Sequence, residues 1–171
     1  EDGIAWPTWM AMVGGVVLLG WLTGHFFRLR GIEPMGWQWT VLVFVSTWIA
    51  DSAAYVVGKF LAGGVLGKHY LAPRLSPNKT VEGYVGGIVI GTALTVFTEY
   101  LLQLPFVAAL VLGLLISTLG PIGDLGSSLL KREAGEKDSG TTFRSHGGAL
   151  DRIDTLMWTT AIAFYVISFI Q

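Results

Sequence analysis

Two neighbouring apolar runs decide the fold of this chain: YVGGIVIGTALTVFTEYLL at residues 84–102 and LPFVAALVLGLLISTLGPIG at residues 104–123. Each has about the 20 apolar residues that an α-helix needs to cross the hydrocarbon core of a bilayer. Gln103 and Pro105 lie at the junction, and proline suits a first helical turn because its missing N–H would have no partner there. The sequence therefore predicts two membrane-spanning helices joined by a tight turn.

Three further apolar runs have similar lengths and lie at residues 4–27, 37–57 and 155–170. The last has only sixteen uncharged residues, so we expect its helix to begin earlier, near Leu150, and to carry Asp151 and Asp154 into the headgroup zone. The predicted fold class is all-α: a polytopic integral membrane helical bundle of about five transmembrane helices with two functional cytoplasmic loops.

We expect residues 1–171 to form a single membrane domain, with the signature region at residues 123–155. Because the chain begins with Glu1 rather than Met, we also expect further spans upstream of it.

Composition supports a membrane protein. Hydrophobic residues make up 52% of the chain, charged residues 13%, and the mean hydropathy is +0.59, whereas a typical soluble domain is about one-quarter charged. The absence of cysteine excludes a disulfide framework and a thiolate metal site. We expect no nucleic-acid partner.

The basic residues give the orientation. Two crossings separate the loops at residues 58–81 and 131–145, so both loops lie on one side of the membrane. These loops hold eight of the eleven basic residues, namely Lys59, Lys68, Arg74, Lys79, Lys131, Arg132, Lys137 and Arg144. The positive-inside rule makes that side cytoplasmic, although Arg28 and Arg30 then fall on the far side.

Small residues recur along the third span. Gly83, Gly87 and Gly91 are four residues apart and share one helical face, where a neighbouring backbone can approach closely. We expect a packing seam within the bundle. A subunit contact, and with it a homodimer, is the alternative.

The signature region brings carboxylates to two helix ends. Asp124, Ser127, Ser128 and Lys131 stand at i, i+3, i+4 and i+7, so they share one face if the fourth helix continues past the membrane. Asp151, Asp154 and Thr155 lie at the start of the fifth helix. Carboxylates from two facing helix ends predict a Mg²⁺ site completed by waters and substrate phosphates, with a second cation as an open alternative.

Basic and flexible residues surround these carboxylates. Lys131, Arg132, Lys137 and Arg152 would neutralise anionic oxygens, and His146-Gly147-Gly148 offers free backbone N–H groups just before a helix, which favours phosphate. Singly, these residues have structural explanations as topology anchors, a turn and a helix-start charge pair. Their convergence predicts a metal-assisted reaction on phosphates.

A second polar cluster lies in the other cytoplasmic loop. Asp51 is inside an apolar span, where an ionisable residue predicts a functional site. Further on, Ser76 and Thr80 can donate hydroxyls and Lys79 can hold a phosphate, while the next helix begins near Thr80 with Glu82 in its first turn. A proline-nucleated turn with a helix cap is the alternative explanation.

These motifs resemble a known family. Ser128-x-Leu130-Lys131-Arg132, Lys137-Asp138 and His146-Gly147-Gly148-x-x-Asp151-Arg152-x-Asp154 follow the signature of the phosphatidate cytidylyltransferases, also called CDP-diacylglycerol synthases. The blocks Asp51-Ser52-Ala53-Ala54-Tyr55, Gly67-Lys68-His69 and Ser76-Pro77-Asn78-Lys79-Thr80-Val81-Glu82-Gly83 are similar to the family's other recurrent blocks. The resemblance runs from about Trp48 to Thr155.

The resemblance implies a Mg²⁺-dependent inner-membrane enzyme that makes CDP-diacylglycerol and pyrophosphate from CTP and phosphatidic acid. The family's metal-binding aspartates map onto Asp124 and Asp151, with Asp154 close by as a supporter. For such a reaction the expected catalytic residues are Asp124, Asp151, Asp154, Lys131 and Lys137. The expected substrate and phosphate contacts are Ser76, Lys79, Thr80, Ser128, Arg132, His146, Gly147, Gly148 and Arg152.

Two other functions remain open at this point. A polyprenol or phytol kinase would use a nucleotide to phosphorylate a membrane alcohol, with Asp151 or His146 as the base. An ion or anion transporter would place charges near mid-membrane in several helices, often in repeated halves, whereas here only Asp51 is deep and no repeat is visible.

Overall fold

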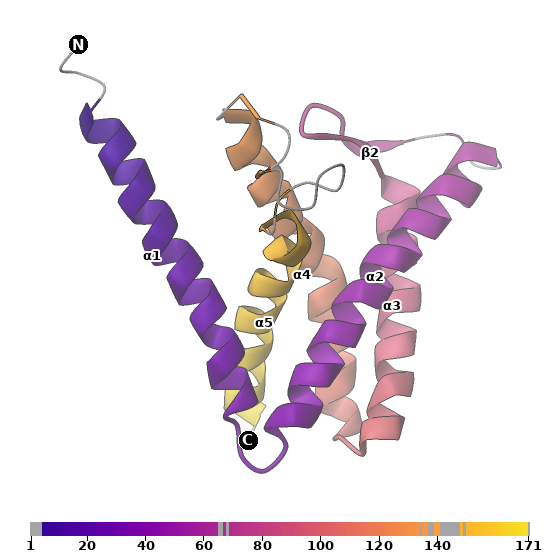
Figure 1. Cartoon of the computed structure of the whole chain (residues 1–171). Coiled ribbons are helices and arrows are strands. Elements are labelled where there is room, and N and C mark those ends of the chain that lie inside the picture. The colour runs from indigo at the N-terminus through magenta and orange to yellow at the C-terminus, as the bar shows by residue number, and fades with distance from the viewer. Residues whose placement is uncertain are drawn as a thin grey trace.

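The computed structural model describes residues 5–64, 67, 69–133, 135–136, 139–140, 148 and 150–170. In chain order its elements are α1 (Ala5–Arg30), α2 (Gly36–Gly64), β1 (Tyr70–Ala72), β2 (Ser76–Thr80), α3 (Val81–Leu102), α4 (Phe106–Glu133) and α5 (Leu150–Ile170). The helices run alternately up and down, and α1 diverges from the others toward its N-terminal end (Figure 1).

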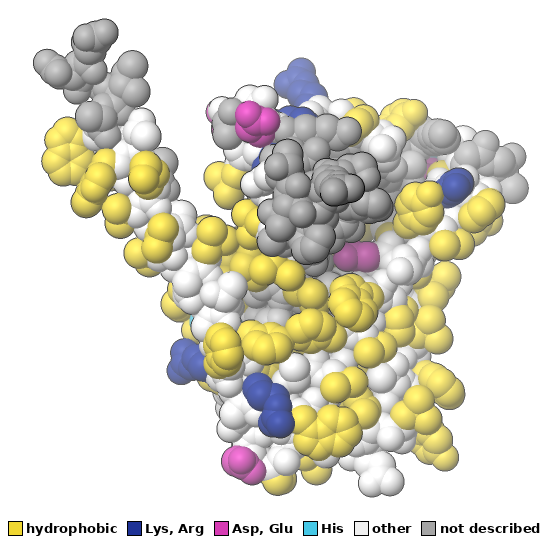
Figure 2. Space-filling view, viewed as in Figure 1, with side chains coloured by type: hydrophobic (Ala, Val, Ile, Leu, Met, Phe, Trp, Pro, Cys, Tyr) yellow, Lys and Arg dark blue, Asp and Glu magenta, His cyan; other side chains and the backbone are white. Residues whose placement is uncertain are grey.

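Five of the described helices are long and apolar enough to cross a membrane. Hydrophobic side chains are spread over the flank of the bundle in Figure 2, as expected for a surface in contact with lipid. The chain is an integral membrane protein, and the predicted all-α polytopic bundle is confirmed. The predicted start of the last helix near Leu150 is also confirmed.

The turn between α3 and α4 forms where the sequence predicted it. Gln103 caps α3 in the left-handed conformation, with φ 55°, and its backbone N–H donates to the carbonyl of Glu99. Pro105 then precedes α4, and its carbonyl accepts the N–H of Ala109 at 3.1 Å. This turn lies at the end of the bundle opposite the β1–β2 hairpin (Figure 1).

The glycine seam of α3 packs against α2 inside the bundle, as predicted. Gly83, Gly87 and Gly91 are buried. A Cβ at Gly83 would lie 2.6 Å from the carbonyl oxygen of Ala54, and one at Gly91 would lie 3.0 Å from the Cβ of Ala50. Only glycine permits this close approach of two helix backbones.

The interior of the bundle combines an apolar cluster with buried hydroxyls. One cluster includes Leu42, Leu112 and Ile167, which come from α2, α4 and α5. Thr47 of α2 donates to Thr159 of α5 at 2.9 Å, and both side chains are buried. Such hydrogen bonds join helices within the membrane, where apolar contacts alone give little preference for helix over lipid.

A short antiparallel hairpin, β1–β2, was not predicted. Tyr70 pairs with Thr80 and Ala72 pairs with Ser76. Thr80 then becomes the N-cap of α3, because its buried hydroxyl accepts the N–H of Gly83 at 3.1 Å. The hairpin, the last turns of α4 and the first turns of α5 lie at the same end of the bundle (Figure 1), here called the hairpin end.

Candidate functional site

Helix α4 carries Asp124 and Lys131 to the hairpin end on one face. The helix continues to Glu133, so the condition for the predicted shared face is met. Ser128 lies on the same face and is partly buried, while Arg132 is exposed and its guanidinium donates to the carbonyl of Glu136 at 3.3 Å. Lys131 therefore points its ammonium group toward the start of α5, where the next carboxylates lie.

Asp151, in the first turn of α5, is the most densely hydrogen-bonded of these carboxylates. Its Oδ1 accepts the Lys131 ammonium at 2.7 Å. Its Oδ2 accepts the backbone N–H groups of Ser139 and Gly148, both at 2.8 Å, and the Ser139 hydroxyl at 3.0 Å. Burial opposes ionisation, but these hydrogen bonds outweigh it and hold the pKa of Asp151 well below its ordinary value. Asp151 is therefore a fixed anion at neutral pH.

Asp154 lies one turn further along α5 and is buried. Its Oδ1 accepts the backbone N–H of Thr155 at 2.8 Å, and its Oδ2 lies 4.0 Å from the Lys131 ammonium. Lys131 is therefore shared between the two carboxylates of α5. The sequence placed Asp151 and Asp154 together by helical spacing, but it did not predict that Lys131 joins them.

Lys79 joins the second polar cluster to the first. Its ammonium group forms an ion pair with the Asp124 carboxylate, across the gap between β2 and α4. Ser76 begins the same strand and pairs with Ala72, and Thr80 serves as the cap of α3. Both explanations offered for this loop therefore have support: Thr80 has the structural role of a helix cap, and Lys79 contacts the carboxylate site.

Asp51 belongs to the same electrostatic cluster. It lies midway along α2, yet its side chain is exposed within this bundle. The charges that act on it are those of Asp124, Lys79 and Asp154. Asp124, Asp151 and Asp154 thus lie with two lysines at the hairpin end, and Asp51 lies further along the bundle on α2.

Some predicted residues fall outside the described part of the chain. These are Lys137, His146, Gly147 and the side chain of Arg152. Gly148 is described and donates its N–H to Asp151 rather than leaving it free. Ser139 was not predicted as a site residue, although its position directly after Lys137-Asp138 in the signature could have drawn attention to it.

The carboxylates at the hairpin end are the oxygen donors that a hard cation prefers. Among the described residues, no three acidic or histidine side chains are close enough to form a metal centre alone. Two carboxylates suffice for Mg²⁺, however, because it usually keeps waters and substrate phosphates as its other ligands. The predicted ligands are Asp124, Asp151 and Asp154, and each of them forms an ion pair with a lysine. The residues therefore fit a hard cation held jointly with a phosphate.

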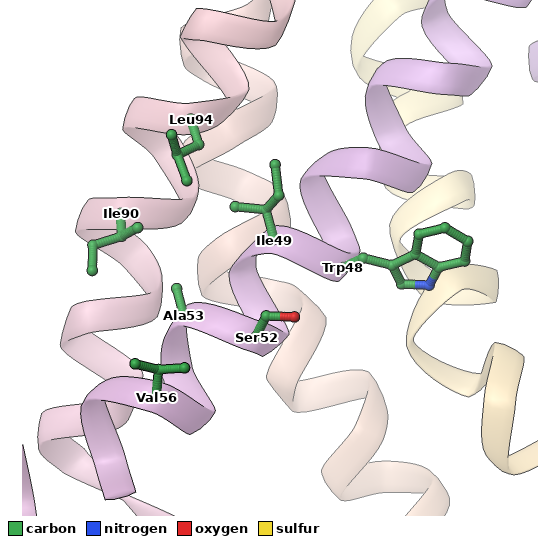
Figure 3. Close-up of a pocket in the computed structure, with 7 residues that line it drawn as sticks. All are labelled: Trp48, Ile49, Ser52, Ala53, Val56, Ile90 and Leu94. Atoms are coloured by element: carbon green, nitrogen blue, oxygen red, sulfur yellow. The ribbon is translucent and has the colours of Figure 1, made fainter. Parts of the chain in front are cut away.

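A separate apolar groove of about 370 Å³ lies between α2 and α3 (Figure 3). Ile90 and Leu94 of α3 form one side, and five residues of α2 form the other: Trp48, Ile49, Ser52, Ala53 and Val56. None of these lining residues is ionisable, so the groove suits contact with lipid chains.

The fold and this cluster define a polytopic membrane protein with carboxylates and lysines gathered at one end of its bundle. Comparison with known proteins then gives the family: the cytidylyltransferase family model matches residues 4–170. The chain belongs to this family.

Similar proteins carry the name phosphatidate cytidylyltransferase. One from Bacillus subtilis is 37% identical over 154 residues, covering 89% of this chain and 55% of the relative. One from Brucella suis is 38% identical over 165 residues, covering 96% of this chain and 57% of the relative. One from Synechocystis is 39% identical over 136 residues, covering 78% and 44%. The chain therefore spans about half the length of these relatives.

Proposed function

We propose that this chain carries the site of a phosphatidate cytidylyltransferase, which makes CDP-diacylglycerol and pyrophosphate from CTP and phosphatidic acid. The observation that carries the proposal is the convergence of Asp124, Asp151 and Asp154 with Lys79 and Lys131 at one end of the bundle. Family membership favours this reaction over a lipid kinase or a transporter.

The reaction needs alignment and charge neutralisation more than a general base. A phosphate oxygen of phosphatidate attacks the α-phosphorus of CTP, a new P–O–P bond forms, and the bond to the β-phosphate breaks so that pyrophosphate leaves. The attacking oxygen is already anionic, so no proton need be removed. The residues of the site therefore have to bring two polyanions together.

We assign Asp124 and Asp151 to hold Mg²⁺, with Asp154 as a supporter and a second cation as an alternative. When bound, the cation would neutralise phosphate oxygens and orient them. Lys131, Lys137 and Arg152 would hold the triphosphate and the leaving pyrophosphate. The remaining proposed phosphate contacts are Ser76, Lys79, Thr80, Ser128, Arg132, His146, Gly147 and Gly148.

The test is direct. Labelled CTP and phosphatidic acid are supplied to the purified chain in detergent micelles with Mg²⁺, and a lipid-soluble cytidine product is expected. A phosphorylated lipid without cytidine would instead indicate a kinase. If the chain is folded and forms neither product, the result would contradict the proposal.

Lys79 gives a sharper kinetic test. If it binds a substrate phosphate, Lys79→Ala should raise the Michaelis constant or lower the turnover. The change should correspond to a free energy of roughly 1.5–3 kcal/mol, the value of a charged hydrogen bond. Lys59→Ala is the matched control, because Lys59 contacts Tyr55 and Phe60 rather than a carboxylate. Unchanged kinetics for both substrates would leave this loop with a structural role only.

The active site should face the cytoplasm, where CTP is present. The chain has no cysteine, so single cysteines at Asn78, Ser139 and Gln103 can be labelled with a membrane-impermeant thiol reagent in intact cells. Asn78 and Ser139 are exposed and belong to the hairpin end, and Gln103 lies in the opposite turn. Only the Gln103 variant should react from outside. External labelling at Asn78 or Ser139 would reverse the proposed orientation.

A further inference from the structure

The Lys79–Asp124 ion pair links the β1–β2 hairpin to helix α4. Lys79 belongs to strand β2, and Asp124 belongs to helix α4. Their side chains are 27% and 31% exposed, so water and ions can reach the pair from the hairpin end. Both residues have an assigned role with another partner under the proposed function: Asp124 with a cation, Lys79 with a phosphate.

The base of the hairpin is anchored independently of this ion pair. The backbone N–H of Val81 donates to the carbonyl of His69 at 2.8 Å. His69 also contacts the Glu82 carboxylate, and Thr80 is buried as the cap of α3 next to Gly58 of α2. The hairpin is thus fixed to α2 and α3 at its base, while Lys79 attaches it to α4.

A divalent cation and the Lys79 ammonium group would compete for the Asp124 carboxylate, because both are positively charged. A divalent cation at this carboxylate would repel the ammonium group of Lys79, and the cation has the larger charge. Once displaced, the Lys79 ammonium group would lie beside the cation and would no longer have the Asp124 carboxylate as its hydrogen-bond acceptor. Phosphate oxygens, which bind cations and ammonium groups alike, would suit that arrangement.

We propose that Lys79 neutralises Asp124 in the cation-free protein, and that it leaves Asp124 when a divalent cation binds there, which frees the β1–β2 hairpin from α4 and makes Lys79 available to a substrate phosphate. Cation binding then precedes productive phosphate binding. This inference rests on the proposed function, because it takes Asp124 as a cation ligand.

The experiment uses the whole chain in detergent micelles and needs no turnover. Mn²⁺ binding without nucleotide is followed by the electron paramagnetic resonance signal of free Mn²⁺, and hydrogen exchange is measured over Tyr70–Thr80 with and without the ion. In the native chain, Mn²⁺ should speed exchange of the hairpin amides. The hairpin amides of Lys79→Met should exchange fast with or without Mn²⁺. This variant should also bind Mn²⁺ about two- to fivefold more tightly, because the competing ion pair is gone.

Two matched variants test whether the effect depends on a positive charge and on its location at residue 79. Lys79→Arg should retain slow exchange and the response to Mn²⁺, and Lys59→Met should behave as the native chain. If Mn²⁺ binds but exchange in the hairpin of the native chain stays the same or slows, the inference is overturned while the proposed function stands. If the native chain binds no Mn²⁺, both the cation assignment of the proposed function and this inference are overturned.

Discussion

Asp124→Asn and Asp151→Asn are each expected to lower turnover by at least about a hundredfold, the usual cost of removing one group that stabilises charge in a reaction. Each substitution removes a negative charge from the cluster at the hairpin end and conserves side-chain volume. Neither residue lies in the apolar core of the bundle, so both variants should stay folded in detergent. Product formation from labelled CTP, with size-exclusion chromatography for folding, measures the two effects separately.

Glu99→Gln is the matched control for these two variants. Glu99 lies near the end of α3, next to the Gln103 turn and away from the hairpin end. It should keep native activity. Near-normal activity of either aspartate variant at low Mg²⁺ would rule out that residue as a cation ligand.

Lys131→Met should have the second-largest effect on turnover, because Lys131 forms ion pairs with two carboxylates. Without it, Asp151 and Asp154 face each other with no ammonium group between them. Turnover should fall at least about tenfold, the loss of a charged hydrogen bond to the substrate. The unfolding free energy should fall by about 2 kcal/mol, less than the roughly 3–5 kcal/mol for breaking a fully buried ion pair.

Thermal unfolding in detergent and the CTP assay test the two parts of this prediction. Lys131→Arg should recover most of the lost stability, because it restores the positive charge beside Asp151. Mg²⁺ should raise the unfolding temperature of Lys131→Met more than that of the native chain, since the cation replaces the missing charge. Native stability in Lys131→Met without Mg²⁺ would show that this ion pair contributes nothing to folding.

The membrane helices could be predicted from the sequence because run length and hydropathy alone decide them. The β1–β2 hairpin could not, because Pro77, Asn78 and Lys79 are residue types depleted in strands. The strand forms there because pairing with β1 satisfies its backbone polar groups.

The site, like the fold, could be predicted from the sequence only in part. Helical spacing placed Asp124, Ser128 and Lys131 on one face, since neighbours on a helix follow from sequence separation. The Lys79–Asp124 pair joins a strand to a helix and depends on how α3 and α4 pack, which no periodicity encodes. Lys137 and His146 lie outside the described residues and stay predictions, as do the homodimer and the single-domain organisation.

The seam between α2 and α3 also sets the position of Lys79 along the axis of the bundle. Helix α3 begins directly after Thr80, so the packing of Gly83 and Gly91 against α2 determines where Lys79 lies relative to the other helices. Sliding α3 by one turn would move Lys79 by about 5.4 Å, enough to take its ammonium group out of contact with Asp124. The close packing of α2 against α3 therefore also sets the distance between Lys79 and Asp124 at the hairpin end.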